Sequence, residues 1–228
     1  IKENMKILKI SAISFICALL TISTATAEVR LGLSAGFAHL EVDGKETLKD
    51  SSVITTHSEQ ANVIIPSIFA EFATDSGLGV GFDWVPGSAD LSASNRTRIA
   101  NGQAGQGNDT GNNVANAEID GLSTIYLHKT FSSGMFLKVG HSSADVNTTE
   151  TLSTGSTYGN TSVDGVVLGL GFTNSTDSGA FFRASVEYTD YDDISLTSQV
   201  ADAVTATTNK IDASVDSTVA KLSIGKAF

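Results

Sequence analysis

Short glycine-closed turns alternate with long polar stretches along this chain, and the alternation sets the number of strands that it can form. The short turns cover residues 73–77, 132–134 and 173–179, and each ends on Gly after Ser. This is the chemistry that a tight hairpin turn requires. The long stretches, near residues 41–62, 87–117, 145–162 and 192–214, are rich in Asn, Thr, Ser, Gly and Asp. Three short turns and four long loops join eight strands, with both chain ends on the short-turn side.

The segments between these connections alternate apolar and polar residues, as strands with one buried face do. Near the C-terminus, for example, Leu222 and Ile224 alternate with Lys221 and Ser223. We expect an all-β, antiparallel up-and-down barrel whose apolar positions face lipid. Residues 101–113 are nearly low-complexity, and we expect them to be disordered. The predicted strands are residues 29–40, 63–72, 78–86, 118–131, 135–144, 163–172, 180–191 and 215–228.

The first 27 residues read as a secretion signal. Basic residues Lys6 and Lys9 precede an uncharged apolar run over residues 10–20, and Ala25-Thr26-Ala27 matches the small-residue cleavage pattern. We expect translation to start at Met5, cleavage after Ala27, and one barrel domain over residues 28–228. The apolar run is shorter than the roughly 20 residues that a membrane-spanning helix needs.

Charge and cysteine content restrict the partners. Removing residues 1–27 takes away three lysines and one glutamate, which leaves 11 basic and 24 acidic residues and a net charge of −13. A chain this acidic repels phosphate backbones, so we expect no nucleic-acid partner. The single cysteine, Cys17, lies in the apolar run, so the mature chain has no thiol chemistry.

Aromatic residues recur at the predicted strand ends. Phe72, Phe131 and Phe172 each stand next to a short turn, and Phe228 ends the chain at the same level. Aromatic girdles of this kind mark the two membrane boundaries of a transmembrane barrel. For the opposite boundary the candidates are Trp84, Tyr188 and Tyr191.

With these features the chain resembles the OmpA/OmpX-type and opacity-type small outer-membrane β-barrels over residues 28–228. The resemblance implies a place in the cell outer membrane, with outer-membrane lipids and lipopolysaccharide as neighbours. It also implies that the barrel assembly machinery recognises the last strand through Phe228, Ile224 and Leu222. Lys226 departs from the aliphatic or aromatic residue usual in that family, although a lysine at the interface can snorkel.

The same alternation points charged residues into the lumen. Eight strands enclose an interior that side chains just fill, so a wide aqueous channel is disfavoured. Three acids and three bases at inward positions can pair with one another. These predicted lumen residues are Glu71, Asp83, Lys138, Arg183, Glu187 and Lys221.

Candidate chemistry is sparse. His141 and Ser143 share the lipid face of one strand, and Glu150 follows in the next stretch; a histidine, a serine and a carboxylate are what nucleophilic acyl transfer needs. The pair resembles the His-x-Ser element of barrel-embedded lipid A deacylases, but ordinary interfacial polar residues explain it as well. No two histidines have metal-ligand spacing, so we expect neither metal nor cofactor.

The sequence therefore favours a non-enzymatic outer-membrane barrel that contributes to envelope integrity and displays loops to a surface ligand of unknown identity. The alternatives are a lipid A acyl hydrolase that uses His141 and Ser143, and a narrow, weakly conducting pore. Pro66 is at odds with a closed barrel, because proline removes a ladder donor. A bulge in the second strand is the explanation that we expect.

Overall fold

The computed structural model describes residues 27–47, 54–91, 114–151, 157–199 and 208–228. The predicted signal segment up to residue 26 and the polar run at residues 101–113 lie outside these ranges. No helix within the ranges is long and apolar enough to cross a membrane. The strands are β1 (Ala27–Thr47), β2 (Ile54–Thr74), β3 (Leu78–Trp84), β4 (Ala89–Leu91), β5 (Val114–Thr130), β6 (Met135–Thr151), β7 (Thr161–Ser175), β8 (Ala180–Tyr191), β9 (Ile194–Thr197) and β10 (Lys210–Ala227).

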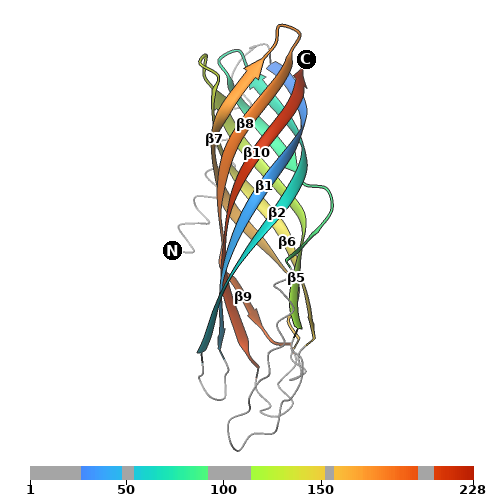
Figure 1. Cartoon of the computed structure of the whole chain (residues 1–228), viewed down its shortest axis with the longest axis vertical. Helices are drawn as coiled ribbons and strands as arrows, with labels where there is room; N and C mark the ends of the chain where they lie inside the picture. Colours follow the sequence, from blue (N-terminus) through green and yellow to red (C-terminus); the bar gives the residue numbers. More distant parts are fainter. Residues whose placement is uncertain (1–26, 48–53, 92–113, 152–156, 200–207) are drawn as a thin grey trace, which may run out of the picture.

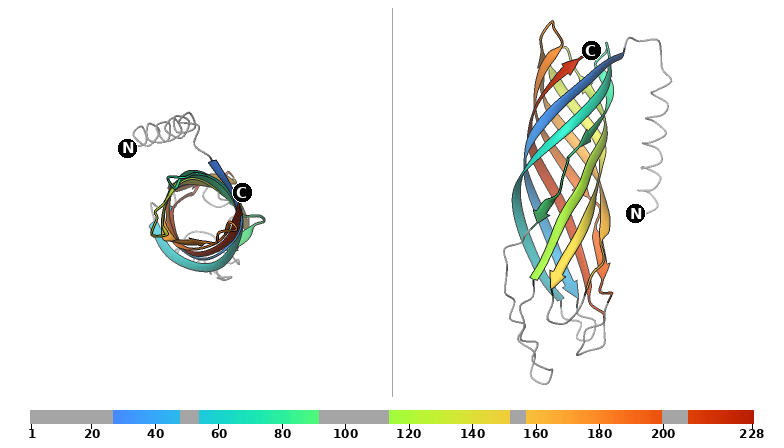
Figure 2. Two further views of the ribbon diagram at one scale, coloured as in Figure 1. Left: turned by 90° about the horizontal axis from the view of Figure 1, so that it is seen from above. Right: turned by 90° about the vertical axis from the view of Figure 1, so that its right-hand side faces the viewer.

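All ten strands form one antiparallel sheet that closes on itself. The strand order around the ring is β1-β2-β3-β5-β6-β7-β8-β10, and β1 pairs with β10 from Arg30–Ala227 to Thr47–Lys210. β4 takes over from β3 beside β5, and β9 takes over from β8 beside β10, so the wall has eight positions. Figure 2 shows the resulting ring end-on. The predicted fold, an eight-stranded antiparallel barrel, is confirmed.

The three short turns share one design, and they lie together at the end that carries the C-terminus (Figure 1). In each turn the glycine N–H donates to the carbonyl three residues earlier: Gly77 to Thr74, Gly134 to Phe131 and Gly179 to Thr176. The three glycines have φ between 81° and 85°, a region that other residues adopt only with strain. Glycine at this position is therefore required by the turn geometry.

The strands extend further from the short turns than the sequence predicts. The expected loop at residues 41–62 is mostly strand, because β1 runs to Thr47 and β2 begins opposite it at Ile54. The stretches 87–117, 145–162 and 192–214 likewise contain β4 with the start of β5, the ends of β6 and β7, and β9 with the start of β10. All four long connections are shorter than expected.

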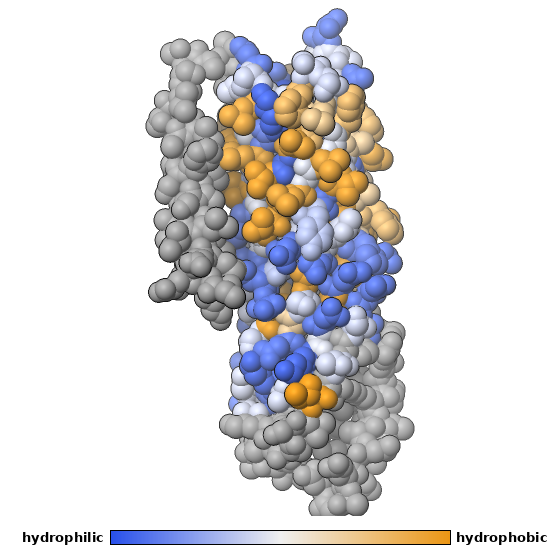
Figure 3. Space-filling view, turned by 90° about the vertical axis from the view of Figure 1, so that its left-hand side faces the viewer, coloured by the Kyte–Doolittle hydropathy of each residue, from blue (hydrophilic) through white to orange (hydrophobic). Residues whose placement is uncertain are grey.

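This difference has a physical reason: apolar residues change face partway along the strands. In β1, Leu33 and Phe37 point outward and are exposed, whereas Ala38 and Leu40 are buried inside. β6 changes in the same way, from exposed Val139 to buried Val146. The barrel is thus apolar outside and polar inside near the short turns, and the reverse further away. Figure 3 shows apolar side chains gathered on the short-turn half of one face.

We call the exposed apolar belt of the short-turn half the apolar band. Its large outward side chains come from β1, β2, β3, β5, β6, β7, β8 and β10, and so surround the barrel. A belt of this kind is the lipid-facing surface of a membrane barrel. It comprises Leu31, Leu33, Phe37, Ile64, Ile68, Phe72, Phe82, Trp84, Ile125, Leu137, Val139, Val166, Leu168, Leu170, Phe172, Phe182, Val186, Leu222 and Ile224.

The barrel wall is split beside β2. β2 pairs with β1 along its whole length, but with β3 only from Ala73–Gly79 to Ile68–Trp84. Beyond Trp84 the neighbouring chain turns toward β5: the Val85 N–H donates to the Leu122 carbonyl, and β4 pairs with β5. Within the described ranges, no strand pairs with β2 on this side beyond Ile68. We call this gap the seam.

Pro66 lies where the seam begins. This position explains how a proline is tolerated in β2 without a bulge. The register between β1 and β2 is uninterrupted, so the expected bulge in the second strand is wrong. The Phe72 carbonyl lies against Gly79 of β3, whereas the Ile65 carbonyl faces Gly36 of β1. Backbone groups alternate sides along a strand, so even-numbered residues of β2 direct theirs toward the seam. The missing Pro66 donor thus breaks no hydrogen bond.

Candidate functional site

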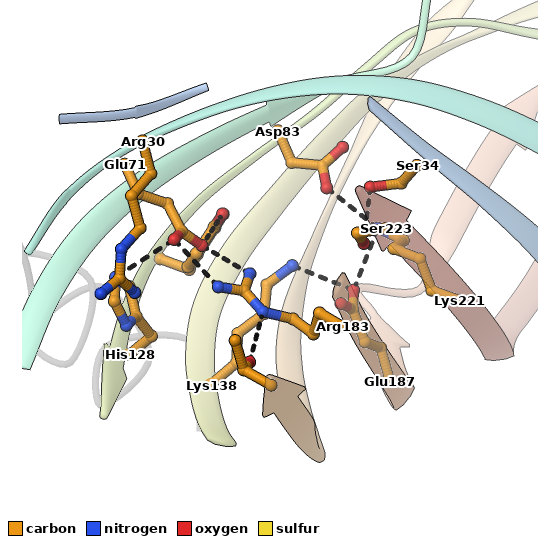
Figure 4. A network of polar contacts seen from close by, with 12 residues as sticks. Arg30, Ser34, Glu71, Asp83, His128, Lys138, Arg183, Glu187, Lys221 and Ser223 are labelled. Atoms are coloured by element: carbon orange, nitrogen blue, oxygen red, sulfur yellow. Dashed lines mark hydrogen bonds and ion pairs between the residues drawn. The ribbon is translucent and has the colours of Figure 1, made fainter. Parts of the chain in front are cut away.

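Charged side chains cross the lumen of the short-turn half (Figure 4). Arg183 of β8 reaches Glu71 of β2 with two parallel hydrogen bonds, Nη1 to Oε1 at 2.7 Å and Nη2 to Oε2 at 3.0 Å. The Tyr126 hydroxyl of β5 donates to the same Glu71 Oε1 at 2.8 Å. All three residues are buried. A carboxylate held by a bidentate guanidinium and a phenol fixes three strands to one another across the interior.

The Arg183 guanidinium is also enclosed by aromatic rings. Its Cζ lies 3.9 Å from the centre of the Phe136 ring, and 5.6 Å from the centres of the Phe69 and Phe181 rings. Such cation–π contacts strengthen when the cation is shielded from water. Arg183 is therefore held both by its ion pair and by the faces of inward-pointing aromatic residues.

A second set of ion pairs lies deeper in the barrel. Lys138 Nζ donates to Glu187 Oε2 at 2.9 Å, and Lys221 Nζ bridges Glu187 Oε2 at 3.3 Å and Asp83 Oδ2 at 3.0 Å. The four residues come from β6, β8, β10 and β3. We call the two sets together the lumen network. It links six strands, β2, β3, β5, β6, β8 and β10, across the interior.

His128 lies beside this network without a hydrogen bond. Its side chain is fully buried, neither ring nitrogen has a hydrogen-bond partner, and Nε2 is 3.7 Å from Glu71 Oε2. The ring packs against Phe136, with 5.5 Å between the ring centres. The structure thus places His128 in the lumen, on the inward face of β5.

The structure places all six predicted lumen residues inside and joins them in the pairs described above. Sequence reasoning did not single out Tyr126, or the rings of Phe69, Phe136 and Phe181. The signal was available: each occupies an inward position in the alternation of its strand. Glycines make the room for them, since a Cβ on Gly81 or Gly140 would overlap the Tyr126 side chain.

The girdle candidates are exposed on the outside of the barrel, with one exception. Phe72, Phe131, Phe172 and Phe228 lie at the short-turn end, and Trp84 and Tyr188 lie further from the short turns. Tyr191 does not belong with them, because it packs inside against Ala144, Val146 and Val163.

The residues predicted to act as an assembly signal lie on the outer face of the closing strand. Leu222 and Ile224 of β10 are exposed outward, and Phe228 closes the ring by donating its N–H to the Val29 carbonyl at 2.9 Å. Lys226 turns its Nζ to the carbonyl of Ser178, and Lys129 does the same with Ser76. These lysines therefore cap turn carbonyls at the short-turn end.

His141 and Ser143 lie on the outer face of β6, just beyond the apolar band. No hydrogen bond joins them, and the His141 Nε2 is instead 3.4 Å from Asp164 Oδ1 of β7, which is the register partner of Ser143. The side chain of the third candidate, Glu150, lies outside the described part of the structure. The carboxylate beside this histidine is therefore Asp164, which the sequence reasoning missed because it is adjacent only through strand pairing.

The outer wall also carries a shallow open depression of about 600 Å³, lined by Asp120, Asp145, Asn147, Asn160, Thr161 and Ser162. Asp120 and Asp145 face each other across β5 and β6. Within the described ranges, no group of three or more His, Cys, Asp and Glu side chains has the arrangement of a metal site.

Neither protein-family models nor characterised protein sequences match this chain. Solved structures do. The outer membrane protein OprG from Pseudomonas aeruginosa aligns with a TM-score of 0.56 at 16% identity, over 90% of this chain and 97% of that one. The outer membrane protease OmpT from Escherichia coli aligns at 0.47 and 9% identity, over 91% and 99%, and Ail of Yersinia pestis at 0.36 and 9%, over 85% and 98%. The first match shows that this chain has the fold of an outer-membrane β-barrel.

Proposed function

We propose that this outer-membrane barrel is a non-conducting, non-enzymatic protein that contributes to envelope integrity and displays its long-loop end outside the cell. The observation that carries the proposal is the lumen network, in which Arg183–Glu71 and Lys138–Glu187–Lys221–Asp83 cross the interior. Paired charges in a narrow barrel bind its strands together and leave no room for a channel.

The extended strands support the display role. Beyond the apolar band β1, β2 and β10 continue as a paired wall up to Thr47, Ile54 and Lys210. This wall is polar outside and apolar inside, as in a water-soluble barrel. It carries the strand ends beyond the apolar band, where lipopolysaccharide and other surface ligands are within reach.

Two measurements test the proposal. The purified barrel in planar bilayers should show no steady conductance, and the Glu71→Ala/Arg183→Ala double variant should conduct if it remains folded. Cells lacking the protein should become more sensitive to detergent, and His141→Ala should restore resistance as well as the wild type does. Steady wild-type conductance would favour a pore instead.

A second candidate, a lipid A acyl hydrolase, is favoured by one observation, the 3.4 Å contact between His141 and Asp164 beside Ser143. In such a site Asp164 would orient the imidazole and the imidazole would take the Ser143 proton. Mass spectrometry of lipid A from cells with and without the protein decides between the two. Loss of an acyl chain that depends on both Ser143 and His141 would establish the hydrolase.

A further inference from the structure

Among the described residues, no acceptor faces the hydrogen-bond donors that β2 directs into the seam, at the edge of the apolar band away from the short turns. By the alternation described above, the N–H groups of Ile64 and Asn62 point into the seam, while those of Val63 and Ile65 face β1. Pro66, one step closer to the short turns, has no N–H. A ligand in the seam would therefore find its first backbone donors at Ile64 and Asn62.

An apolar groove lies on the outer face of the wall, on the short-turn side of these donors. It has a volume of about 440 Å³, and its lining is almost wholly apolar. The small residues Ala70 and Gly32 form its floor, and the side chains of Ile68, Phe82 and Trp84 line its sides. The full lining is Leu31, Gly32, Leu33, Ile68, Phe69, Ala70, Phe82 and Trp84.

Polar residues on the side of the groove away from the short turns mark where the membrane interior ends. His39 Nδ1 is 2.9 Å from Asn62 Oδ1, and Gln60 donates to Glu41 on the same outer face. From Ile68 in the groove, β2 reaches Ile64 after about 13 Å of extended strand and Asn62, at the boundary, after about 20 Å. An acyl chain that fills the groove thus brings its ester linkage to the level of the free N–H groups.

We propose that the seam and groove form a binding site for one ester-linked lipid of the outer leaflet. Its acyl chain fills the groove between Ile68, Phe82 and Trp84, and the ester carbonyl of that chain accepts a hydrogen bond from the N–H group of Ile64. The Asn62 N–H lies about 7 Å further along the strand, where it donates to the second ester carbonyl of the same diacyl lipid. Lipid is the occupant because the groove opens within the lipid-facing band. The ester linkage is the part of the lipid that is recognised, because these backbone N–H groups require an acceptor where water is scarce.

The first test measures backbone amide hydrogen exchange by NMR on the refolded barrel in detergent that lacks ester groups. The amides of Asn62 and Ile64 should exchange at least tenfold faster than those of Val63 and Ile65. Adding an ester phospholipid should slow Ile64 and Asn62 selectively. Equal protection of the even and odd residues before lipid is added would show that the seam is covered, and would overturn the proposal.

The second test uses Trp84, the single tryptophan, as a probe of the groove. A phosphatidylethanolamine with brominated acyl chains should quench Trp84 fluorescence saturably at low lipid content. The ether-linked analogue, which lacks the carbonyl, should bind about fivefold more weakly, the effect of a lost hydrogen bond. Quenching that rises in proportion to lipid content would indicate ordinary annular contact and overturn the proposal.

Matched variants assign the site. Ala70→Leu fills the floor of the groove and should weaken binding about tenfold, since it displaces part of the chain. Ala184→Leu makes the same change on the outer face of β8, away from the groove, and should leave binding unchanged. Equal effects of both variants, or tighter binding of a brominated free fatty acid than of the ester lipid, would contradict the assignment.

Discussion

Arg183 and Glu71, 112 residues apart in sequence, face each other across the lumen with their hydrogen-bonding groups in parallel at 2.7 and 3.0 Å. Both side chains are almost wholly shielded from solvent. Removing one partner of such a pair leaves an uncompensated buried charge. We therefore expect Glu71→Ala to lower the free energy of unfolding by about 3–5 kcal/mol, measured by urea titration of the barrel in detergent.

The controls for this prediction are two further variants. Glu28→Ala removes the exposed partner of Arg30 and should cost less than about 1 kcal/mol. Glu71→Ala combined with Arg183→Met removes both charges and should be more stable than Glu71→Ala alone. A double variant as unstable as the sum of its single changes would show that the pair is not coupled.

A second prediction concerns Gly134, whose φ of 85° sets the middle short turn. A Cβ there would lie 2.7 Å from the Thr173 carbonyl oxygen, whereas Gly87 has the same φ and nothing within 4 Å. Both alanine variants should suffer the backbone strain of about 1–2 kcal/mol, and Gly134→Ala should lose more. Thermal unfolding compares them. Equal losses would mean that the contact with Thr173 is relieved by a small shift.

The barrel could be predicted from sequence because its turns and the apolar band are local signals. The glycine-closed turns fix where strands reverse, and Leu31 to Phe37 show the alternation of a lipid-facing strand. The strands beyond the apolar band could not be predicted, because from Ala38 and Leu40 onward the apolar residues face inward and the polar residues face outward. The polar residues outside then resemble a loop, and only pairing with β2 and β10 shows that they are strand.

The candidate site was predictable to the same extent. Alternation places Glu71 and Arg183 inside, but which acid meets which base depends on the stagger of the closed ring, which one sequence does not give. Pro66 shows the same limit. Its presence indicates that one backbone hydrogen bond between strands is missing. Only the structure, in which the chain leaves β2 after Trp84, shows that this bond would have been on the β3 side.

A third prediction concerns Asp212, which lies on the polar outer part of β10. Hydrogen bonds from Lys210, at 2.6 Å, and from Ser195 hold the pKa of Asp212 below its usual range. The associated stabilisation is present above the ordinary aspartate pKa and is lost as pH falls through the lowered one. In NMR titrations, Lys210→Gln should raise the Asp212 pKa more than Ser195→Ala does. An unchanged value in Lys210→Gln would show that the pair does not persist in solution.

The last prediction concerns Phe228, which closes the ring at the short-turn end. Its N–H donates to the Val29 carbonyl and its own carbonyl accepts from the Val29 N–H at 3.3 Å, while the residue is 73% exposed. An exposed interfacial ring contributes no more than about 1–3 kcal/mol, which is small beside eight paired strands. If the assembly machinery engages this end, deleting Phe228 should reduce the amount of assembled barrel more than it reduces the stability of the barrels that form. The reason is kinetic, since a slowly inserted chain stays exposed to proteolysis.

Phe172→Ala is the matched control, because Phe172 is an equally outward-facing aromatic of the short-turn end but lies in an internal strand, β7. It should lower stability by a similar amount and leave the assembled yield near the wild-type level. Heat-modifiable gel mobility of outer-membrane fractions measures the folded yield, and urea titration of the purified barrels measures stability. Equal yields from the Phe228 deletion and the wild type would rule out a role for the last residue in assembly. Equal loss of yield in both variants would instead assign the effect to the girdle as a whole.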